Sequence, residues 1–444
     1  MTKFYLEGNF APVPDEKTAF DLPVEGSIPS VLEGRYLRNG PNPRNGDAGH
    51  WFFGEGMIHG VELRGGRATW FRNRHVRTPS FEQCRQVVGE NGLVDVSVNV
   101  ANTNVIAHGG RILALAENTE PTEVGPELDT IGSFDFGGRL RTAMTAHPKR
   151  CPVTGELHFF GYGYCPPFLT YHRADAAGNL VQSEVIEVPG ATMVHDFAIT
   201  EHSVVFMDLP VVFDPTMIMS GTMPFHWSDD YGARIGIMPR GAGASDVRWF
   251  EVEPCYVFHP LNAVEDPSGK IEVDVVRYPY IWRADQDDFP PATLHRWTVD
   301  TTAASVKEQP LDDQNIEFPR VDERCVGRLH RYGYAVNGAE EGLTFGTAMT
   351  KYDLVTDSFE RHDFGPRRSP GEGVFVPASD GASEDEGYVL SYVYDAARDT
   401  SDLVILDASD FAAAPVATIG LPQRVPYGYH GNWVADAELQ KPQS

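Results

Sequence analysis

The chain has 444 residues, of which 41% are hydrophobic and 22% are charged, with 43 Gly and 33 Pro. This composition is typical of a folded globular protein and excludes a disordered or fibrous chain. The formal net charge is −27, from 63 acidic and 36 basic residues, which argues against nucleic acid as a partner because the phosphates would be repelled.

The N-terminal sequence MTKFYLEGNFAPVPDEK has no basic flank followed by an apolar segment, so we expect no secretory signal. No run approaches 18 consecutive apolar residues, so we expect no membrane span. The five Cys residues are odd in number and form no C-x-x-C pair, as is typical of reduced thiols. Together these features predict a cytoplasmic protein.

Short β-rich runs recur in pairs along the chain, each pair joined by Gly, Pro, Asn, Asp or other polar residues. The predicted hairpins are 103–107 with 111–117, 196–199 with 204–209, 262–265 with 270–277, and 388–395 with 403–407. Helix-like segments are brief, at 82–89 and 216–221. The pattern predicts an all-β barrel, sandwich or propeller. No linker divides the chain, so we expect one domain over residues 1–444.

One apolar stretch, LPVVFDPTMIMSGTMPFHW at 209–227, carries a single charged residue, Asp214, and three of the ten Met. The first interpretation is a buried loop or pair of helices. The second is an apolar entrance for a hydrophobic substrate, with peripheral membrane contact. Met would supply adaptable apolar contacts in such an entrance.

Four of the fifteen His share a context beside a turn residue or at the start of a strand: His147, His195, His259 and His430. For any single His a structural role is more common. In a radial architecture, however, strands from different blades could bring four imidazoles to one axial point. Imidazole ligands suit Zn, Cu, Fe and Ni, so the ligand type alone does not identify the metal.

Several other catalytic motifs are absent. The sequence has no H-E-x-x-H zinc protease motif, no G-x-S-x-G hydrolase motif, and neither of the Gly-rich nucleotide-binding motifs.

Three acids occupy notable positions: Glu117 ends the apolar run ILALAE, Glu317 lies in NIEFPRVD, and Glu372 lies in PGEGVFVP. The ordinary interpretation is a solvated acid at a strand end. A buried Glu needs a partner, and the N–H of a metal-bound imidazole is a suitable one.

These pieces together resemble the carotenoid cleavage oxygenase family, which includes apocarotenoid, retinoid and stilbene-cleaving members. Nine motifs carry the resemblance in order, at 34–43, 50–63, 101–117, 134–162, 194–210, 258–266, 317–324, 371–377 and 425–434. Phe53 and Gly373 stand where family members commonly carry Asp and Pro, which indicates an outlying bacterial-type member.

The resemblance implies an all-β, seven-bladed β-propeller with a loop and helix cap over an axial iron site. It implies that Fe(2+) is bound by His147, His195, His259 and His430. It further implies that Glu117, Glu317 and Glu372 support His195, His259 and His430 respectively. His147 would then lack a carboxylate partner.

The implied activity is that of a non-haem Fe(2+) dioxygenase, which uses O₂ to cleave a C=C bond into two carbonyl products. The implied oxygen and substrate pocket contains Thr103, Phe52, Phe81, Ala116 and Phe258. The alternative for Thr103 is a plain strand residue. We expect an apolar alkene substrate.

Stilbene-cleaving relatives hold a phenol hydroxyl with a Lys and a Tyr, and Ala116 and Phe81 stand in those positions here. Since a buried phenol without a partner would bind poorly, we predict a carotenoid or apocarotenoid substrate. A stilbene or other phenylpropanoid alkene is the alternative. An isomerohydrolase, a zinc hydrolase and a propeller that binds without catalysis are further alternatives. The sequence leaves the oligomeric state open.

Overall fold

The computed structural model describes residues 3–85, 95–219, 223–285, 289–339 and 345–440. Its contacts divide the chain into two compact units. Unit 1 contains residues 1–146, 347–351 and 359–444, and unit 2 contains residues 147–346 and 352–358. The expectation of one domain over the whole chain stays a prediction.

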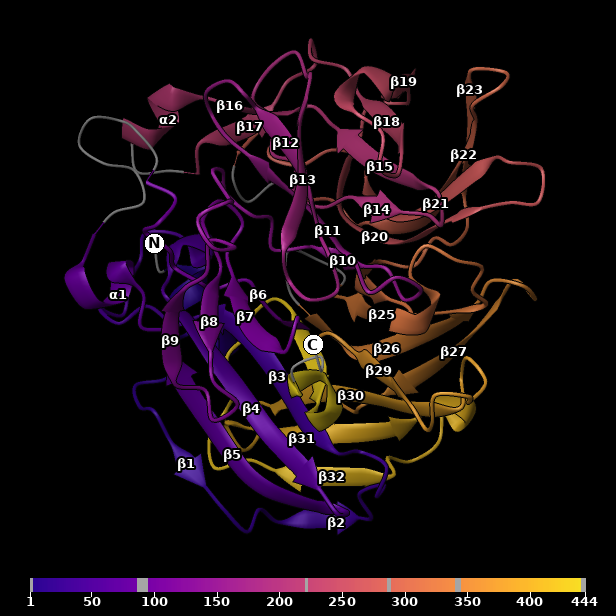
Figure 1. Ribbon diagram of the computed structural model, residues 1–444. Coiled ribbons are helices and arrows are strands. Elements are labelled where there is room, and N and C mark those ends of the chain that lie inside the picture. The colour runs from indigo at the N-terminus through magenta and orange to yellow at the C-terminus, as the bar shows by residue number, and fades with distance from the viewer. Residues whose placement is uncertain (1–2, 86–94, 220–222, 286–288, 340–344, 441–444) are drawn as a thin grey trace. The chain divides into compact units, whose positions relative to one another are not determined.

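Unit 1 contains three sheets (Figure 1). The first has the order β1 (Thr18–Ala19), β5 (Arg67–His75), β4 (Gly56–Arg64), β3 (Gly34–Pro41) and β33 (Gly431–Ala435). The second has the order β2 (Val24–Gly26), β32 (Ala417–Gly420), β31 (Thr400–Asp407), β30 (Gly387–Asp395) and β28 (Arg368–Pro370), and β29 (Val374–Pro377) also pairs with β30. The third has the order β6 (Asn104–His108), β7 (Arg111–Leu115), β8 (Thr122–Val124) and β9 (Thr130–Ser133).

Unit 2 contains three four-stranded sheets and one two-stranded sheet. The first has the order β10 (Lys149–Arg150), β11 (Leu157–Tyr162), β12 (Leu169–Ala174) and β13 (Leu180–Ile186). The second has the order β14 (Ala198–Ile199), β15 (Ser203–Asp208), β18 (Arg234–Pro239) and β19 (Arg248–Glu251). The third has the order β20 (Tyr256–Glu265), β21 (Ile271–Tyr278), β22 (Thr293–Asp300) and β23 (Ser305–Pro310). The small sheet pairs β16 (Val211–Phe213) with β17 (Phe225–Trp227).

A further four-stranded sheet has the order β24 (Ile316–Arg320), β25 (Tyr332–Gly338), β26 (Phe345–Asp353) and β27 (Ser358–Asp363). Within the described residues, seven sheets therefore have four or more strands. They are the blades of a seven-bladed β-propeller, which confirms the expected fold class.

Helices are few and short in the described residues. The α-helices are α1 (Pro79–Gln83) and α2 (Pro215–Met219). The 3₁₀ turns are η1 (Phe4–Leu6), η2 (Gly8–Phe10), η3 (Trp51–Phe53), η4 (Ala244–Asp246), η5 (Glu323–Cys325), η6 (Ala408–Asp410) and η7 (Asp436–Leu439). The described helices include none with the length and apolar character needed to cross a bilayer. The cap over the metal centre stays a prediction.

The predicted hairpins are confirmed, with small shifts at their ends. The turn between β6 and β7 shows why they form, because His108 pairs with Arg111 across a two-residue turn. Gly109 and Gly110 in that turn have φ of 57° and 74°. Two consecutive positive φ values produce the twist that tight hairpins need, and Gly adopts them without strain.

The two helix predictions have different outcomes: the first needs correction, and the second is confirmed over its described residues. The helix predicted at 82–89 ends at Gln83, because Cys84 adopts the left-handed conformation that stops a helix; residues 86–89 lie outside the described part. The helix predicted at 216–221 is α2, which begins at Pro215, and residues 220–221 lie outside the described part.

The described residues of the apolar stretch at 209–227 do not form a pair of helices. They form β16, α2 and β17. Leu209, Val211, Met223 and Phe225 are each 5% exposed or less, which favours the buried interpretation of this segment. Burying these side chains stabilises the fold at roughly 25 cal/mol per Å² of apolar surface.

Unit 1 is held together by pairing between the two ends of the chain. Arg35 pairs with Val434 between β3 and β33, and Val24 pairs with Ile419 between β2 and β32. Residues of β3 to β5 and of β29 to β32 share one buried apolar cluster, which includes Val61, Phe71 and Leu390. This pairing places β33, and the loop before it, at a defined position in unit 1.

Candidate metal centre

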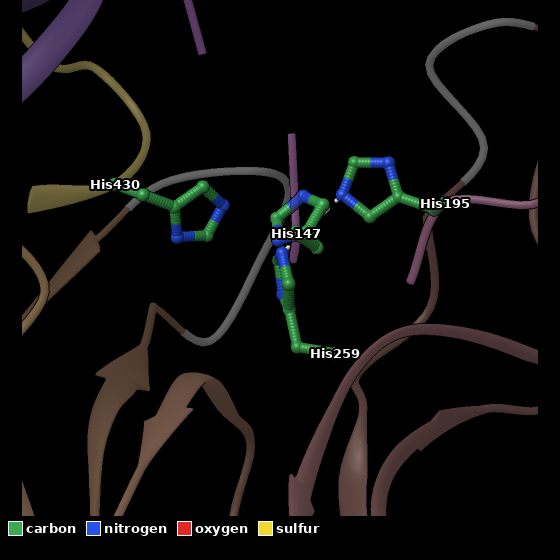
Figure 2. Close-up of side chains that lie close together, drawn as sticks. All are labelled: His147, His195, His259 and His430. Carbon is green, nitrogen blue, oxygen red and sulfur yellow. Dashed lines mark hydrogen bonds between the residues drawn. The ribbon is translucent and has the colours of Figure 1, made fainter. Parts of the chain in front are cut away.

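The four predicted His side chains come together. His147 lies two residues before β10, His195 three residues before β14, His259 within β20, and His430 directly before β33. Each imidazole offers one ring nitrogen, and these four atoms all lie within 4.8 Å of one another (Figure 2). His147, His259 and His430 are buried and His195 is partly buried.

Three of these imidazoles lie in unit 2 and make a tight group. The ring centroids of His147 and His195 are 4.4 Å apart, and the other two pairs are each 5.1 Å apart. The Nε2 atoms of His195 and His259 are 3.3 Å apart. Neutral imidazoles whose lone pairs converge in this way fit a shared cation, to which each nitrogen would bind at about 2.0–2.1 Å.

A break in strand pairing positions His259. The register of β20 against β21 shifts on both sides of Pro260, because a Pro cannot donate a hydrogen bond to the neighbouring strand. A bulge of this kind redirects the adjacent side chain. The His-Pro pair at 259–260 therefore turns the His259 imidazole out of the regular alternation of the strand.

The Glu317 carboxylate accepts a hydrogen bond of 2.6 Å from His259 Nδ1. Phe318 has a φ of 53°, an uncommon value for a bulky residue, and its backbone N–H donates to the same carboxylate. The Phe318 ring stacks on the His259 ring at 5.5 Å. Glu317 thus holds His259 through Nδ1 and leaves Nε2 as the metal-binding atom.

Tyr278 contributes a contact that the sequence did not predict. Its hydroxyl donates to the second oxygen of Glu317 over 3.1 Å. Burial and the neighbouring Glu317 charge raise the pKa of Tyr278 well above its ordinary value, so the hydroxyl stays protonated. Burial by itself would raise the pKa of Glu317, but the electrostatic influence of the His259 imidazole and the hydrogen bonds that the carboxylate accepts hold this pKa below its ordinary value.

Glu372 holds His430 in the same way within unit 1. One carboxylate oxygen accepts from His430 Nδ1 over 3.0 Å, and the other accepts from the backbone N–H of Gly431 over 2.9 Å. Glu372 is 2% exposed. The backbone N–H of His430 donates to the Thr103 carbonyl over 3.1 Å, which ties the imidazole to the start of β6.

Glu117 lies two residues after β7 and is partly buried. Burial, followed by the charge of Glu117, raises the pKa of Tyr429 well above its ordinary value, which places Glu117 near the residue before His430. The support of His195 by Glu117 stays a prediction.

A carboxylate that the sequence did not predict lies near His147, and the expectation that His147 lacks a carboxylate partner stays a prediction. The Oδ2 atom of Asp196 lies 3.8 Å from His147 Nδ1. Sequence reasoning missed Asp196 because it directly follows His195, and the chain direction there decides which imidazole its carboxylate faces.

The five predicted pocket residues have different surroundings. Phe258 packs edge-on against His195, with centroids 5.0 Å apart, and against Tyr278 at 5.5 Å. Phe52 in η3 packs against Tyr429 at 5.8 Å. Thr103 is 9% exposed, and its hydroxyl donates to Asn102 over 2.9 Å.

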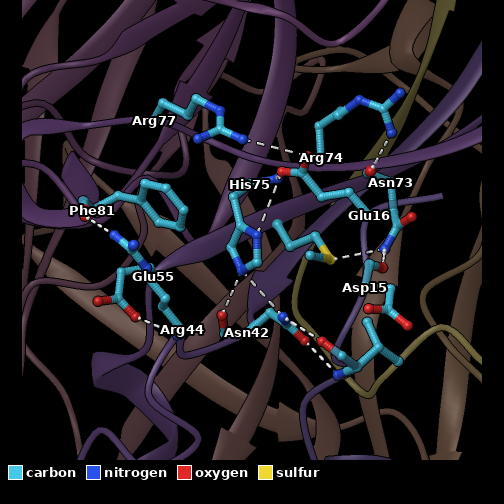
Figure 3. A network of polar contacts seen from close by, with 12 residues as sticks. Asp15, Glu16, Asn42, Arg44, Glu55, Asn73, Arg74, His75, Arg77 and Phe81 are labelled. Atoms are coloured by element: carbon cyan, nitrogen blue, oxygen red, sulfur yellow. Dashed lines mark hydrogen bonds and ion pairs between the residues drawn. The ribbon is translucent and has the colours of Figure 1, made fainter.

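The last two pocket residues, Phe81 and Ala116, are 7% and 4% exposed. Figure 3 shows the Phe81 ring beside a polar network of unit 1. The guanidinium groups of Arg44 and Arg77 lie 5.0 and 5.3 Å from its centroid, and the His75 ring lies 4.9 Å away. The pocket roles of all five residues stay predictions.

The fold and the cluster define the class of protein, a β-propeller with a buried four-histidine centre. Comparison with known families agrees, because the family described as "Retinal pigment epithelial membrane protein" matches residues 10–435. A carotenoid cleavage oxygenase of Mycobacterium tuberculosis is 40% identical over 495 aligned positions, covering 97% of both chains. A carotenoid 9,10(9′,10′)-cleavage dioxygenase of Crocus sativus is 35% identical, covering 98% of this chain and 90% of that one.

Solved structures give the same answer. The lignostilbene dioxygenase of Pseudomonas brassicacearum superposes with a TM-score of 0.89 at 32% identity, covering 97% of this chain and 98% of that one. The cobalt-substituted Synechocystis ACO superposes with a TM-score of 0.84 at 31% identity, covering 96% and 97%. The chain belongs to the carotenoid cleavage oxygenase family.

Proposed function

We propose that the chain is a non-haem Fe(2+) dioxygenase that cleaves a C=C bond of a carotenoid or apocarotenoid. One alkene and one O₂ would be consumed, and two carbonyl compounds would be formed. Because both oxygen atoms enter the products and the alkene supplies the electrons, the reaction needs no reducing co-substrate. Family membership supports oxidative alkene cleavage, since the relatives include carotenoid-cleaving and lignostilbene dioxygenases.

The single observation that carries the proposal is the convergence of four imidazole nitrogens within 4.8 Å. His147, His195, His259 and His430 would hold the metal. These residues fit a divalent ion because their donors are neutral nitrogens, and Glu317 and Glu372 direct Nε2 of His259 and His430 toward the centre. Imidazole suits several transition metals; a cobalt-substituted relative supports a divalent metal at this kind of site.

An Fe(2+) ion at this centre would supply the activation of O₂ toward an electron-rich double bond. The protein itself would hold the imidazoles in place, exclude water and present one double bond to the centre. Aromatic side chains such as Phe258 against His195 suit that task. Thr103 would crowd one side of the centre, with its backbone carbonyl already fixed to the N–H of His430.

The proposed substrate is apolar because Ala116 and Phe81 offer no hydroxyl or amine to a phenol. A stilbene is the second candidate, and the TM-score of 0.89 with a lignostilbene dioxygenase favours it. A buried phenol hydroxyl would need a hydrogen-bond partner. The two candidates therefore differ in one requirement: a stilbene needs a side chain in the pocket that forms a hydrogen bond with its phenol hydroxyl.

We also propose a reducing cellular compartment, in keeping with the cytoplasmic location expected from the sequence. All five cysteines are free thiols, and Cys151 and Cys255 are buried.

The test is product analysis with the full chain, loaded with Fe(2+) without air and then exposed to O₂. An apocarotenal and a hydroxystilbene are supplied in parallel. Aldehydes from the polyene would support the primary proposal, and aldehydes from the stilbene alone would support the second. Products formed without O₂ consumption would overturn both in favour of an isomerohydrolase or a zinc hydrolase.

A further inference from the structure

The segments that carry His147 and His195 are joined by a second pair of residues. Lys149 lies two residues after His147, and Asp196 directly follows His195. The Nζ atom of Lys149 lies 2.8 Å from Oδ1 and 2.9 Å from Oδ2 of Asp196. Each partner of this ion pair is therefore fixed to the backbone of a different ligand-bearing segment.

The ion pair is shielded from water on one side. The side chain of Asp196 is 2% exposed and that of Lys149 is 20% exposed. The backbone N–H of Phe197 also donates to Asp196 Oδ1, over 2.7 Å. A buried ion pair adds little net stability compared with apolar residues of similar volume, whereas removal of one partner is costly. A positional role accounts for such a pair better than a contribution to stability.

The third contact of this group is with an imidazole. Asp196 Oδ2 lies 3.8 Å from His147 Nδ1. This distance is longer than the 2.6 Å between Glu317 and His259 and the 3.0 Å between Glu372 and His430. The Asp196 carboxylate also differs from those two glutamates because an ammonium group neutralises it at close range.

We propose that Lys149 and Asp196 are positioning residues that set the orientation of His147 and its spacing from His195. This inference rests on the proposed function, in which both imidazoles bind the metal. Asp196 faces the Nδ1 side of His147, so Nε2 is the nitrogen left for the centre. Lys149 compensates the charge of Asp196, so His147 is oriented without an added negative charge beside the ion.

The test measures metal binding in the full chain, with Co²⁺ as the probe and a competing chelator. The variants are Asp196→Asn, which keeps the shape but removes the charge, and Lys149→Met, which keeps the length. We expect each to weaken Co²⁺ binding about 10- to 100-fold, the usual effect of losing a partner that orients a metal ligand. The visible absorption of bound Co²⁺ should also change, because the ligand geometry changes.

The matched control is Arg234→Met, which breaks another buried ion pair of unit 2. Arg234 Nε lies 2.9 Å from Asp208 Oδ2, and these side chains are 26% and 0% exposed. This variant should unfold at a lower temperature without metal while keeping Co²⁺ affinity within about twofold, because Arg234 is not attached to a ligand segment. Lys149→Arg should restore affinity and absorption, because it restores the ion pair.

Two results would overturn the inference. The first is a Lys149→Met chain that unfolds earlier, as the control does, but binds Co²⁺ like the unmodified chain. The second is an unchanged Co²⁺ spectrum in both variants. The His147→Ala variant distinguishes failure of this inference from failure of the proposed function. The four-His centre itself is wrong if the unmodified chain binds no Co²⁺, or if His147→Ala binds Co²⁺ as tightly as the unmodified chain does. Should Asp196→Asn not fold, the two Lys149 variants decide the question.

Discussion

The Glu317 carboxylate and the His259 imidazole form a hydrogen bond of 2.6 Å between two strands, β24 and β20. Each residue lies where the register of its strand shifts: His259 directly precedes Pro260, and Glu317 lies two residues before Pro319. In a regular strand, successive side chains point to alternate faces of the sheet. The two bulges interrupt this alternation and turn the two side chains toward each other. This contact is local to unit 2, and it can be tested by itself.

Glu317→Gln should weaken metal binding about 10- to 100-fold, because an amide holds the imidazole N–H less firmly than a carboxylate. Affinity for Co²⁺ or Fe²⁺ by chelator competition measures the effect. Glu308→Gln is the matched control, since Glu308 accepts hydrogen bonds from Trp297 and from the backbone of Glu253. Equal loss in both variants would show that Glu317 acts only through general stability.

Tyr278→Phe removes the hydroxyl that donates to Glu317 and keeps the ring that packs on Phe258. We expect metal affinity to fall roughly two- to tenfold, in line with about 0.5–1.5 kcal/mol for one hydrogen bond. Tyr231→Phe is the control. It removes the hydroxyl that donates to Asp208 and should leave the metal affinity unchanged. If Tyr278→Phe binds the metal as tightly as the unmodified chain, Tyr278 has no role in metal binding.

Metal removal should abolish product formation and lower the unfolding temperature. A ligand that binds only the folded chain stabilises it by about 2.7 kcal/mol at a free concentration 100 times its dissociation constant. Thermal unfolding with increasing Fe²⁺ under nitrogen measures the shift. His195→Ala should show no shift, whereas His172→Asn, at a buried His bonded to Ser183, should still show one. An identical shift in His195→Ala would contradict the ligand assignment.

His172 should make stability depend on pH below neutrality. Burial lowers the pKa of His172 from 6.5 to about 4, so the unfolded chain takes up a proton at a higher pH than the folded one. The stabilising contribution is complete above about pH 6.5 and is lost as the pH falls toward 4, with a slope of up to about 1.4 kcal/mol per pH unit. The measurement is the free energy of unfolding of the metal-free chain, obtained with urea between pH 7 and 5. As the pH falls, this free energy should decrease less steeply for His172→Gln than for the unmodified chain. Parallel curves would contradict this assignment.

Ala116→Lys combined with Phe81→Tyr should supply two side chains that can form hydrogen bonds with the hydroxyl of a phenol. We expect hydroxystilbene cleavage to rise about tenfold or more relative to apocarotenal cleavage, since hydrogen bonds to a charged group contribute roughly 1.5–3 kcal/mol. The measurement is the ratio of aldehydes formed from a mixture of both substrates. Phe359→Tyr at an exposed position is the control. An unchanged ratio would place phenol recognition elsewhere.

The sequence by itself predicted the features that depend on residue type and local pattern. The short paired runs predicted hairpins such as β6 with β7, because turn residues and strand residues lie next to each other in the chain. The four His and the acids Glu317 and Glu372 could be named because ligand chemistry restricts residue type. The family motifs ordered them into one centre.

Only the tertiary structure decided which groups meet. The pairing of β3 with β33 joins residues about 400 positions apart, and no local signal encodes such a pair. The helix predicted from residue 82 stops at Gln83, because the backbone of Cys84 turns left-handed. Tyr278 and Asp196 were missed because an ordinary strand residue and an ordinary acid become partners of the centre only through their direction in space. Composition and spacing carry the identity of a side chain, and the packed backbone carries its orientation.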